Sequence, residues 1–322
     1  MSIYARGVMA AVLMGLPPQL AAAVDYPARP IRMVVPFAPG GGSDIAGRIL
    51  ADGLSRALGQ QVVVDNRPGA GSSVGTDIAA KATPDGYTTL LGNISLAFNT
   101  ALYKKLPYNV LRDLAPVSLV CEQPNILVAH PSLRAKTLQE LVALAKAEPG
   151  KLTYASAGLG SGTHLAMALL TMSLKIDMIH VPYKGTGPAI TALLGNEVST
   201  FMSTFASALP HVKAGRLRSF GVTTTKRART LPDVPTIAES GLPGFNYGTW
   251  YGLLTPAGTP RAIVAKLNQA TVAQLHAPDV EQRFDGQGME VMPTTPEEFA
   301  AKLKSETEKW ADVVRSAKIP QQ

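Results

Sequence analysis

The sequence is short of cysteine, of aromatic residues and of charge. Its 322 residues include one cysteine, 6% aromatic residues and 16% charged residues, against 46% hydrophobic residues. Disordered chains are poorer in apolar residues and richer in charge, so that class is excluded. The scarcity of aromatic residues argues against the stacking platforms with which proteins bind single-stranded nucleic acid.

The excess of positive charge is modest, with 30 basic and 23 acidic side chains and a formal net charge of +7. These charges are spread along the chain, and only the run from Lys226 to Arg229 is densely basic. We therefore expect no nucleic-acid partner. The basic surface either favours an anionic small ligand or serves only solubility.

Long apolar runs are absent except near the N-terminus, where the run is too short to span a bilayer. Arg6 precedes the apolar segment 8–16, and small residues lead up to Ala23. This order is typical of a secretory signal peptide, which we expect to occupy residues 1–23 and to be cleaved after Ala23. The alternative is an N-terminal helix that frays.

The single cysteine, Cys121, lies in the mature chain and has no internal partner for a disulfide. Export without disulfides suits a protein of the bacterial periplasm with a core large enough to be stable alone. We expect Cys121 to be a small buried residue rather than a nucleophile.

Short apolar runs alternate with helical patterns along the mature chain, which predicts a mainly parallel α/β architecture without metal or disulfide staples. The length suggests two domains, and no repeat or low-complexity linker separates them. We therefore expect the chain to cross between domains through strands, with a cleft between them. Strands are expected at 31–37, 61–65, 88–91, 125–129, 152–156, 178–181, 199–202 and 217–223.

Capping boxes, in which a Thr precedes a Glu by three residues, mark expected helix starts. They occur at Thr137–Glu140, Thr236–Glu239 and Thr295–Glu298. Apolar residues broadly on one face predict a further helix from Asp44 to Leu58.

Two glycine-rich loops have the same construction, since each follows an expected strand and precedes an expected helix. The first runs from Phe37 to Asp44 and the second from Ser156 to His164. A helix start leaves about four backbone N–H groups without intrahelical partners and favours an anion. Both loops are therefore candidate receivers for a carboxylate or phosphate, although ordinary strand-to-helix turns have the same sequence features.

The sequence lacks the motifs of the common enzyme classes. Neither loop continues into the Gly-Lys-Ser/Thr of a phosphate-binding P-loop. The segment from Gly69 to Gly75 is one residue too long for a dinucleotide fingerprint, and no nucleophile elbow occurs. The histidines lack metal-ligand spacing. We expect no catalytic residue, no metal and no cofactor.

Two residues of the loops allow two interpretations each. His164 either bonds a ligand or only caps and packs the helix start. Asp44 either orients the amides of its own loop or bonds a polar group of the ligand, and the two roles are compatible.

Ordered segments along nearly the whole mature chain resemble the Bug-type substrate-binding proteins of tripartite tricarboxylate transporters. The segments are 26–32, 35–44, 66–71, 84–88, 106–108, 180–185, 214–218, 232–236, 239–241 and 256–260. Any one of them is a weak signal, but the ordered set is specific.

The resemblance implies a two-lobed periplasmic binding protein of type II, the Venus-flytrap kind, with a mainly parallel sheet in each lobe and a ligand cleft between them. The expected division is lobe 1 at 24–124 and 249–322, and lobe 2 at 125–248. It implies capture of a small organic carboxylate (mono-, di- or tricarboxylate) without chemistry, by a protein we expect to be a monomer. Integral-membrane permease subunits are the implied partners.

The resemblance also implies that the two glycine-rich loops hold the ligand from opposite lobes. The strand end at 93–95 is expected to line the first lobe, and Thr204 the second. The expected ligand-binding residues are Phe37, Pro39, Gly40, Gly41, Gly42, Ser43, Asp44, Ser95, Ser156, Gly160, Ser161, Gly162, Thr163, His164 and Thr204.

Many relatives carry an acidic residue near Thr204, and this chain has none between Phe201 and Thr204. That departure weakens the case for an amino-acid ligand, whose ammonium group needs a carboxylate partner. Phe37 and Phe98 either sandwich an apolar part of the ligand or belong to the core.

Two rival functions remain. A sensor module that presents its closed form to a signalling partner would use the same lobes. An α/β enzyme, either a hydrolase or a cofactor-dependent oxidoreductase, is disfavoured by the missing motifs.

Overall fold

The structure is a computed structural model that describes residues 26–316 and 321. The expected signal peptide and its cleavage after Ala23 lie outside these residues. The strands are β1 (Ile31–Val35), β2 (Val62–Asn66), β3 (Thr88–Asn93), β4 (Leu114–Ala129), β5 (Thr153–Ser156), β6 (Ile179–Pro182), β7 (Thr200–Thr204), β8 (Arg218–Val222), β9 (Gly248–Pro256) and β10 (Glu290–Val291). The helices are α1 (Gly42–Leu58), η1 (Ala70–Ser72), α2 (Ser73–Ala80), α3 (Ser95–Leu102), α4 (Val110–Asp113), α5 (Leu138–Ala147), α6 (Gly162–Leu174), α7 (Thr186–Leu194), α8 (Phe205–Lys213), α9 (Arg261–Leu275), α10 (Pro278–Gly286) and α11 (Pro296–Ser316).

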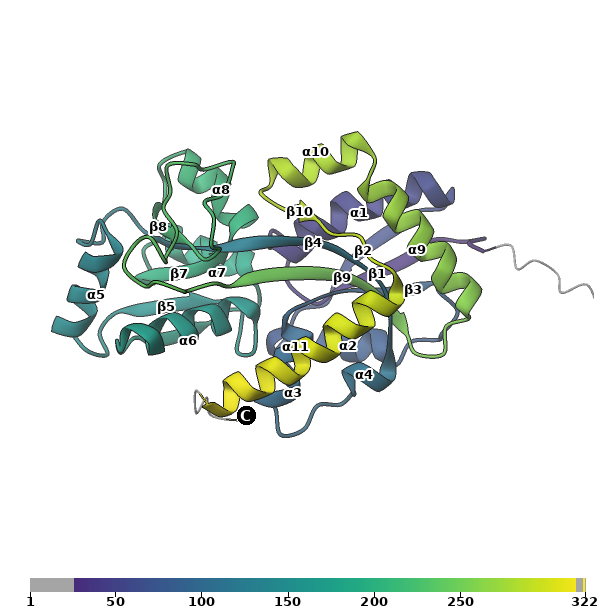
Figure 1. The fold of residues 1–322 in the computed structure, drawn as a ribbon, viewed down its shortest axis with the longest axis horizontal. Helices are drawn as coiled ribbons and strands as arrows, with labels where there is room; N and C mark the ends of the chain where they lie inside the picture. Colours follow the sequence, from purple (N-terminus) through teal and green to yellow (C-terminus); the bar gives the residue numbers. More distant parts are fainter. Residues whose placement is uncertain (1–25, 317–320, 322) are drawn as a thin grey trace, which may run out of the picture.

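The strands form two groups that give the molecule two lobes (Figure 1). In lobe 1, β1 lies between β2 and β3 and is parallel to both. In lobe 2, β5 lies between β6 and β7 and is parallel to both. The expected two-lobed α/β fold is confirmed, and the outer strands are parallel as predicted. The strands between them, β4 and β9, run antiparallel to their neighbours.

The long strands β4 and β9 carry the chain from one lobe to the other, and Figure 1 shows them passing side by side through the middle of the molecule. From Leu114 to Pro124, β4 pairs with β9. From Asn125 to Ala129 it pairs with β7, and from Ile126 with β8. The sequence predicted only the second part as a strand, because Pro116 and Pro124 interrupt the first. The ladder shifts register next to Pro116, the kind of irregularity at which a strand tolerates proline.

Each lobe has its own buried core, and a third cluster continues from one lobe to the other. Met33, Leu50 and Leu253 belong to the core of lobe 1, whereas Phe201 and Phe205 belong to that of lobe 2. The continuous cluster contains Phe98 on α3, Leu165 on α6 and Trp310 on α11. The lobes therefore meet over a packed apolar layer as well as through two strands.

Two of the predicted capping boxes begin helices. Thr137 and Thr295 accept hydrogen bonds from the N–H groups of Glu140 and Glu298, and α5 and α11 follow. The box at Thr236 also forms, since the Glu239 N–H donates to Thr236 Oγ1 over 3.0 Å. It is followed only by a turn, so the predicted helix there is wrong. Glycine and proline at 241–244 supply the physical reason, because they disfavour a continuing helix.

Candidate functional site

A small cavity of about 20 Å³, which is room for about one water molecule, lies between the lobes. It takes its walls from the ends of strands and the first turns of helices in both lobes. The lining residues are Phe37, Gly41, Gly42, Ser43, Asn93, Ala157, Ser161, Gly162, Thr163, Thr186, Thr204 and Thr249.

The starts of helices from both lobes converge on this cavity. The cap or first-turn residues of α1 in lobe 1, and of α6, α7 and α8 in lobe 2, are among its lining. No side chain caps α1 or α7, whereas Gln123 Oε1 accepts from the Ala206 N–H in the first turn of α8 at 3.1 Å. Uncapped helix starts in a largely buried place favour an anion as their partner, because the first N–H groups have no intrahelical acceptor.

The first loop is held in shape by the carboxylate of Asp44. It accepts hydrogen bonds from the Gly40 N–H at 3.0 Å, from Asn66 Nδ2 at 3.0 Å and from Arg48 at 3.1 Å. Burial acts to raise the pKa of this carboxyl, but the bonds from Arg48, Gly40 and Asn66 outweigh burial and lower it. Asp44 is therefore ionised and fully engaged with the protein, and it lies outside the cavity lining.

The second loop is organised by its own hydroxyl groups. Ser161 caps α6 by accepting from the His164 N–H at 3.2 Å, and Thr163 Oγ1 accepts from the Ala157 N–H at 2.8 Å. Ser156 Oγ accepts from the Gly158 N–H at 3.1 Å. These local bonds leave the first turn of α6 facing the cavity in a fixed geometry.

Behind the second loop, His164 and His180 stack with their ring centroids 4.3 Å apart, and Tyr154 stacks on His180 at 4.9 Å. His164 Nδ1 accepts from the Gly160 N–H at 3.4 Å, and His180 Nε2 lies 2.6 Å from Ser156 Oγ. Burial, with the neighbouring His180, lowers the pKa of His164 to about 3, and burial lowers that of His180 to about 4. Both imidazoles are therefore neutral, and they support the loop from the side away from the cavity.

The lobes are closed over the cavity. Ser207 Oγ of α8 donates to the carbonyl oxygen of Gly40 in the first loop at 2.9 Å. The Ala38 N–H donates to the carbonyl of Lys184 at 3.3 Å, and Tyr103 donates to the carbonyl of Leu159 at 3.2 Å. Residues of both glycine-rich loops line the same cavity, so the loops face each other across it.

The structure brings eight of the predicted site residues into the cavity lining and leaves the other seven outside it. The lining contains Phe37, Gly41, Gly42, Ser43, Ser161, Gly162, Thr163 and Thr204. Pro39, Gly40, Asp44, Ser95, Ser156, Gly160 and His164 are not among the lining residues. Phe98 is fully buried in the continuous core cluster, which settles its role in favour of the core.

The sequence analysis missed Thr186 and Thr249, and it named Asn93 only as part of a strand end and Ala157 only within the second loop. Thr186 begins α7 directly after the segment 180–185 that carried the resemblance, so the position of the motif before a helix was an available signal. Thr249 lies on β9, which the sequence analysis did not predict.

No lining residue carries a charged side chain. The only polar groups available to a ligand are hydroxyl groups, the amide of Asn93 and backbone groups. An anionic ligand would therefore be held by dipoles rather than by an ion pair, and a cationic group would find no counter-charge.

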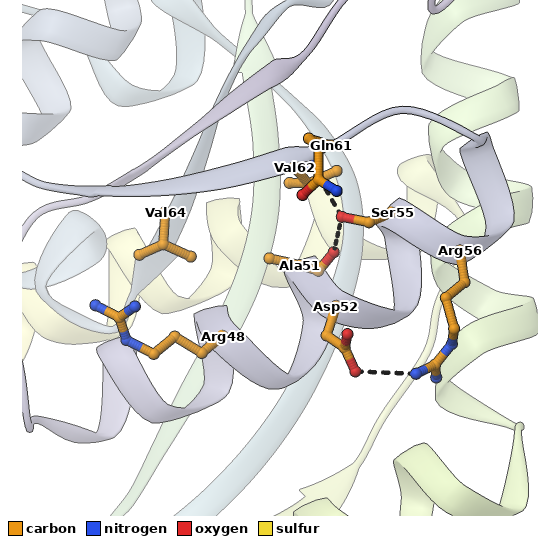
Figure 2. A pocket seen from close by; sticks show the side chains of 8 residues that line it. All are labelled: Arg48, Ala51, Asp52, Ser55, Arg56, Gln61, Val62 and Val64. Carbon is orange, nitrogen blue, oxygen red and sulfur yellow. Dashed lines mark hydrogen bonds and ion pairs between the residues drawn. The ribbon is translucent and has the colours of Figure 1, made fainter.

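A wider hollow of about 460 Å³, open to solvent, lies on the outside of lobe 1 between α1 and β2 (Figure 2). Several of its polar side chains are already engaged in ion pairs or hydrogen bonds. Arg56 pairs with Asp52 at 2.9 Å, and Ser55 Oγ donates to the Ala51 carbonyl and accepts from the Val62 N–H. This hollow is a solvated surface and not the candidate site.

Among residues 26–316 and 321, no group of three or more His, Cys, Asp or Glu side chains is placed to hold a metal ion. Within the same residues, no helix combines the length and the apolar character needed to cross a membrane.

A family model described as "Tripartite tricarboxylate transporter family receptor" matches residues 46–319. Three solved structures share the fold over nearly the whole chain. The periplasmic binding protein BugD is 36% identical, with a TM-score of 0.90 over 92% of this chain and 100% of its own. R. palustris Rpa4515 with adipate is 32% identical, with a TM-score of 0.89 over 92% of this chain and 100% of its own. MatC (Rpa3494) from Rhodopseudomonas palustris with bound malate is 36% identical, with a TM-score of 0.86 over 90% of this chain and 100% of its own.

Proposed function

The chain belongs to the tripartite tricarboxylate transporter receptor family, and we propose that it captures a small organic carboxylate between its lobes and releases it unchanged. The observation that carries this proposal is the convergence of helix starts from both lobes on one small cavity without charged side chains. Each helix start stabilises an exposed anion by about 0.3–1 kcal/mol and a partly buried anion by up to about 2 kcal/mol. Micromolar binding needs about 8 kcal/mol. Several helix starts, the hydroxyl groups of the lining and the exclusion of water on closure together supply a sum of that order.

The lining also limits the ligand. The structures with adipate and malate show that relatives take dicarboxylates in this fold. An amino acid is disfavoured here, because its ammonium group would be buried beside Thr204 and Thr249 without a carboxylate partner.

We further propose that residues 1–23 direct export and that the mature chain works in the periplasm, as the name of BugD states for that relative. We also propose that the ligand is delivered to integral-membrane permease subunits, which the description of the family as a transporter receptor supports. The division into lobe 1 (24–124 and 249–322) and lobe 2 (125–248) is supported by the change of partner along β4 between Pro124 and Asn125.

The ligand class is tested by isothermal titration of the mature chain with a panel of carboxylic acids and with the amides and methyl esters of the same acids. We expect at least one acid to bind and its amide and ester to bind at least about tenfold more weakly, since neutral groups gain little from helix dipoles. Equal affinities for acids and amides would contradict anion capture. A variant with Gly286 replaced by alanine serves as the control, because a Cβ at that position has nothing within 4 Å and Gly286 is not among the cavity-lining residues.

A further inference from the structure

The net positive charge of the described residues lies on lobe 2. Residues 125–248 carry twelve basic and six acidic side chains, whereas the described residues of lobe 1, 26–124 and 249–316, carry sixteen of each. The basic residues are spread along the sequence, but the fold gathers their excess on one lobe. A one-sided charge of this kind attracts that side of a protein to anionic surfaces.

Most of the basic residues of lobe 2 lie at the end that points away from the cavity. The parallel strands β5 and β7 begin at this end and finish at the cavity, since β5 leads into the second loop and β7 ends at Thr204. Figure 1 shows α5 at the same far end of the lobe. A partner bound here would therefore not cover the cavity.

Four segments of the chain meet at this end, which we call the basic pole. Ser132 Oγ donates to Asn196 Oδ1 at 3.1 Å and joins the first segment to the third. The Gly150 N–H donates to the Asp177 carbonyl at 3.3 Å and joins the first to the second. Arg218 of the fourth segment donates to backbone carbonyls of the first at 2.9 Å. The segments are 130–152, 172–179, 195–199 and 211–218.

The basic pole has eight basic and four acidic side chains. Arg134 pairs with Glu148 at 2.8 Å, and Arg218 is engaged with carbonyl groups. In lobe 1, by contrast, ten of the sixteen described basic side chains form ion pairs. The other six cations of the pole are exposed and form no ion pair with a described residue. They are Lys136, Lys146, Lys151, Lys175, Lys213 and Arg216.

The ends of helices explain only part of this pattern. Lys146 and Lys213 lie in the last turns of α5 and α8, and Lys175 follows α6, where the helix dipole favours a cation. Lys136 lies beside the start of α5, where the dipole disfavours one. The remaining two cations lie in turns and bends between elements. Half of the exposed cations therefore have no local structural role of this kind.

Two exposed apolar side chains lie among the lysines. Met172, near the end of α6, is 43% exposed, and Ile179, at the start of β6, is 50% exposed. The Lys175 N–H donates to the Met172 carbonyl at 3.1 Å, and the Ile179 N–H donates to the carbonyl of Leu152, the neighbour of Lys151. Apolar side chains beside lysines are typical of surfaces that lie on a membrane.

We propose that the basic pole binds the surface of a membrane that contains anionic phospholipids. The lysines lie at the lipid phosphates, and Met172 and Ile179 reach the level of the headgroups. Five of the six free cations are lysines, whose flexible point charges suit a diffuse layer of phosphates. A defined acidic site on a protein would instead favour the planar fork of arginine. This surface is separate from the cavity, and its use does not depend on which ligand the cavity takes.

Cosedimentation of the mature chain with lipid vesicles tests the proposal. One set of vesicles contains phosphatidylethanolamine and phosphatidylglycerol, and the other contains phosphatidylcholine alone. We expect binding to the anionic vesicles at low salt and at least about tenfold weaker binding to the neutral ones. Binding to the anionic vesicles should also weaken at least about tenfold in about 0.5 M sodium chloride, because salt screens charges at a surface.

A triple variant identifies the surface responsible. Lys146→Gln, Lys151→Gln and Lys175→Gln together should weaken binding to the anionic vesicles by about tenfold or more, since each lysine near such a surface contributes about fivefold. All three side chains are exposed, so the thermal unfolding of the variant should match that of the unmodified chain.

The matched control removes the same charge from lobe 1. Lys104→Gln, Lys105→Gln and Lys304→Gln change exposed lysines without a described ion-pair partner, and this variant should bind the vesicles like the unmodified chain. Ile179→Thr keeps a branched side chain on β6 but removes apolar contact, and it should weaken the binding that remains at high salt.

The outcomes are distinct. Absence of binding to the anionic vesicles at low salt would overturn the proposal, and so would equal losses in the two triple variants, because total charge would then be the cause. Binding of the pole to soluble polyglutamate without binding to vesicles would overturn it in favour of an acidic protein partner. These measurements need no carboxylate, so the failure of carboxylate capture and the failure of membrane binding are distinguishable.

Discussion

The N–H of Gly162 donates a hydrogen bond to the Oγ of Ser95 across the cleft at 3.1 Å. Gly162 is the first residue of α6 in lobe 2, and Ser95 is the first residue of α3 in lobe 1. The bond therefore joins the starts of two helices from different lobes. In an open form water would take the place of Ser95, so the bond contributes to closure and not to the stability of either lobe.

We expect Ser95→Ala to weaken ligand binding by about 1–3 kcal/mol, because closure would then bury the Gly162 N–H without an acceptor. Ser95 is fully buried in the closed form, so water cannot replace it. The measurement is titration with the best-binding carboxylate, alongside the free energy of unfolding. Ser305→Ala, at an exposed position on α11, is the control. An unchanged dissociation constant would contradict the role of this bond in closure.

Gly42→Ala should weaken binding and also destabilise lobe 1. A Cβ at this position would overlap Gln123 Nε2 and Tyr251 Oη, which are buried in the same lobe, and would lie 3.2 Å from Thr204 Cβ in lobe 2. Overpacking of this kind costs about 1–3 kcal/mol, and opening of the lobes relieves only the contact with Thr204. Titration and thermal unfolding of the variant check both halves of the prediction, with Gly286→Ala beside it. Normal affinity in Gly42→Ala would mean that α1 does not approach β4 and β7 as closely as the structure shows.

The site was predictable to the extent that it depends on local chain geometry. A buried strand, a run of glycines and a helix start are adjacent in the sequence, so the two loops and their opposed helix starts followed from residues 31–58 and 152–174. The ordered motifs identified the family, and the match to residues 46–319 confirms it. The assignment of those loops to a ligand remains a proposal.

The parts that depend on distant pairing were not predictable. β9 is buried on both faces and contains Gly252, where the ring of Phe299 packs against the backbone, so it shows neither alternation nor β-branched enrichment. Its partner β4 lies more than 100 positions earlier. Thr249 lies on this strand. Because the strand was not predicted, Thr249 was not predicted as a cavity residue. At Thr236 the local capping signal was real, but the glycines that follow it overrode the helix.

Cys121 should not react with a thiol reagent in the native protein. It is fully buried on β4 with Met289 Sδ 3.8 Å from its sulfur, and burial together with Glu122 raises the pKa of its thiol. The reactive form is the thiolate, which is both disfavoured and inaccessible here. Labelling with a chromogenic disulfide should be no faster than unfolding of the chain. In denaturant, one thiol per chain should react. Fast labelling of native protein would contradict the burial of this strand.

The neutral histidines behind the second loop should make the protein less stable as the pH falls from 7 to 5. The unfolded chain binds a proton on each imidazole near pH 6.5, whereas the pKa of His164 in the folded chain is about 3. The unfolded state therefore takes up more protons, and the free energy of unfolding decreases with falling pH until the folded pKa is reached. Between pH 6.5 and 5, His164 alone accounts for about 2 kcal/mol of this loss. His180, with a pKa of about 4, adds to it in the same direction.

Urea unfolding at several pH values between 7 and 5 measures this slope. His164→Gln removes the titrating ring but keeps an acceptor for the Gly160 N–H, so its stability should depend less steeply on pH than that of the unmodified chain. His276→Gln changes an exposed histidine at the end of α9 and should leave the slope as it is. Equal slopes for the unmodified chain and for His164→Gln would show that His164 becomes protonated without unfolding. The stack would then be a site that water reaches, and the second loop would lose the rigid support that this geometry gives it.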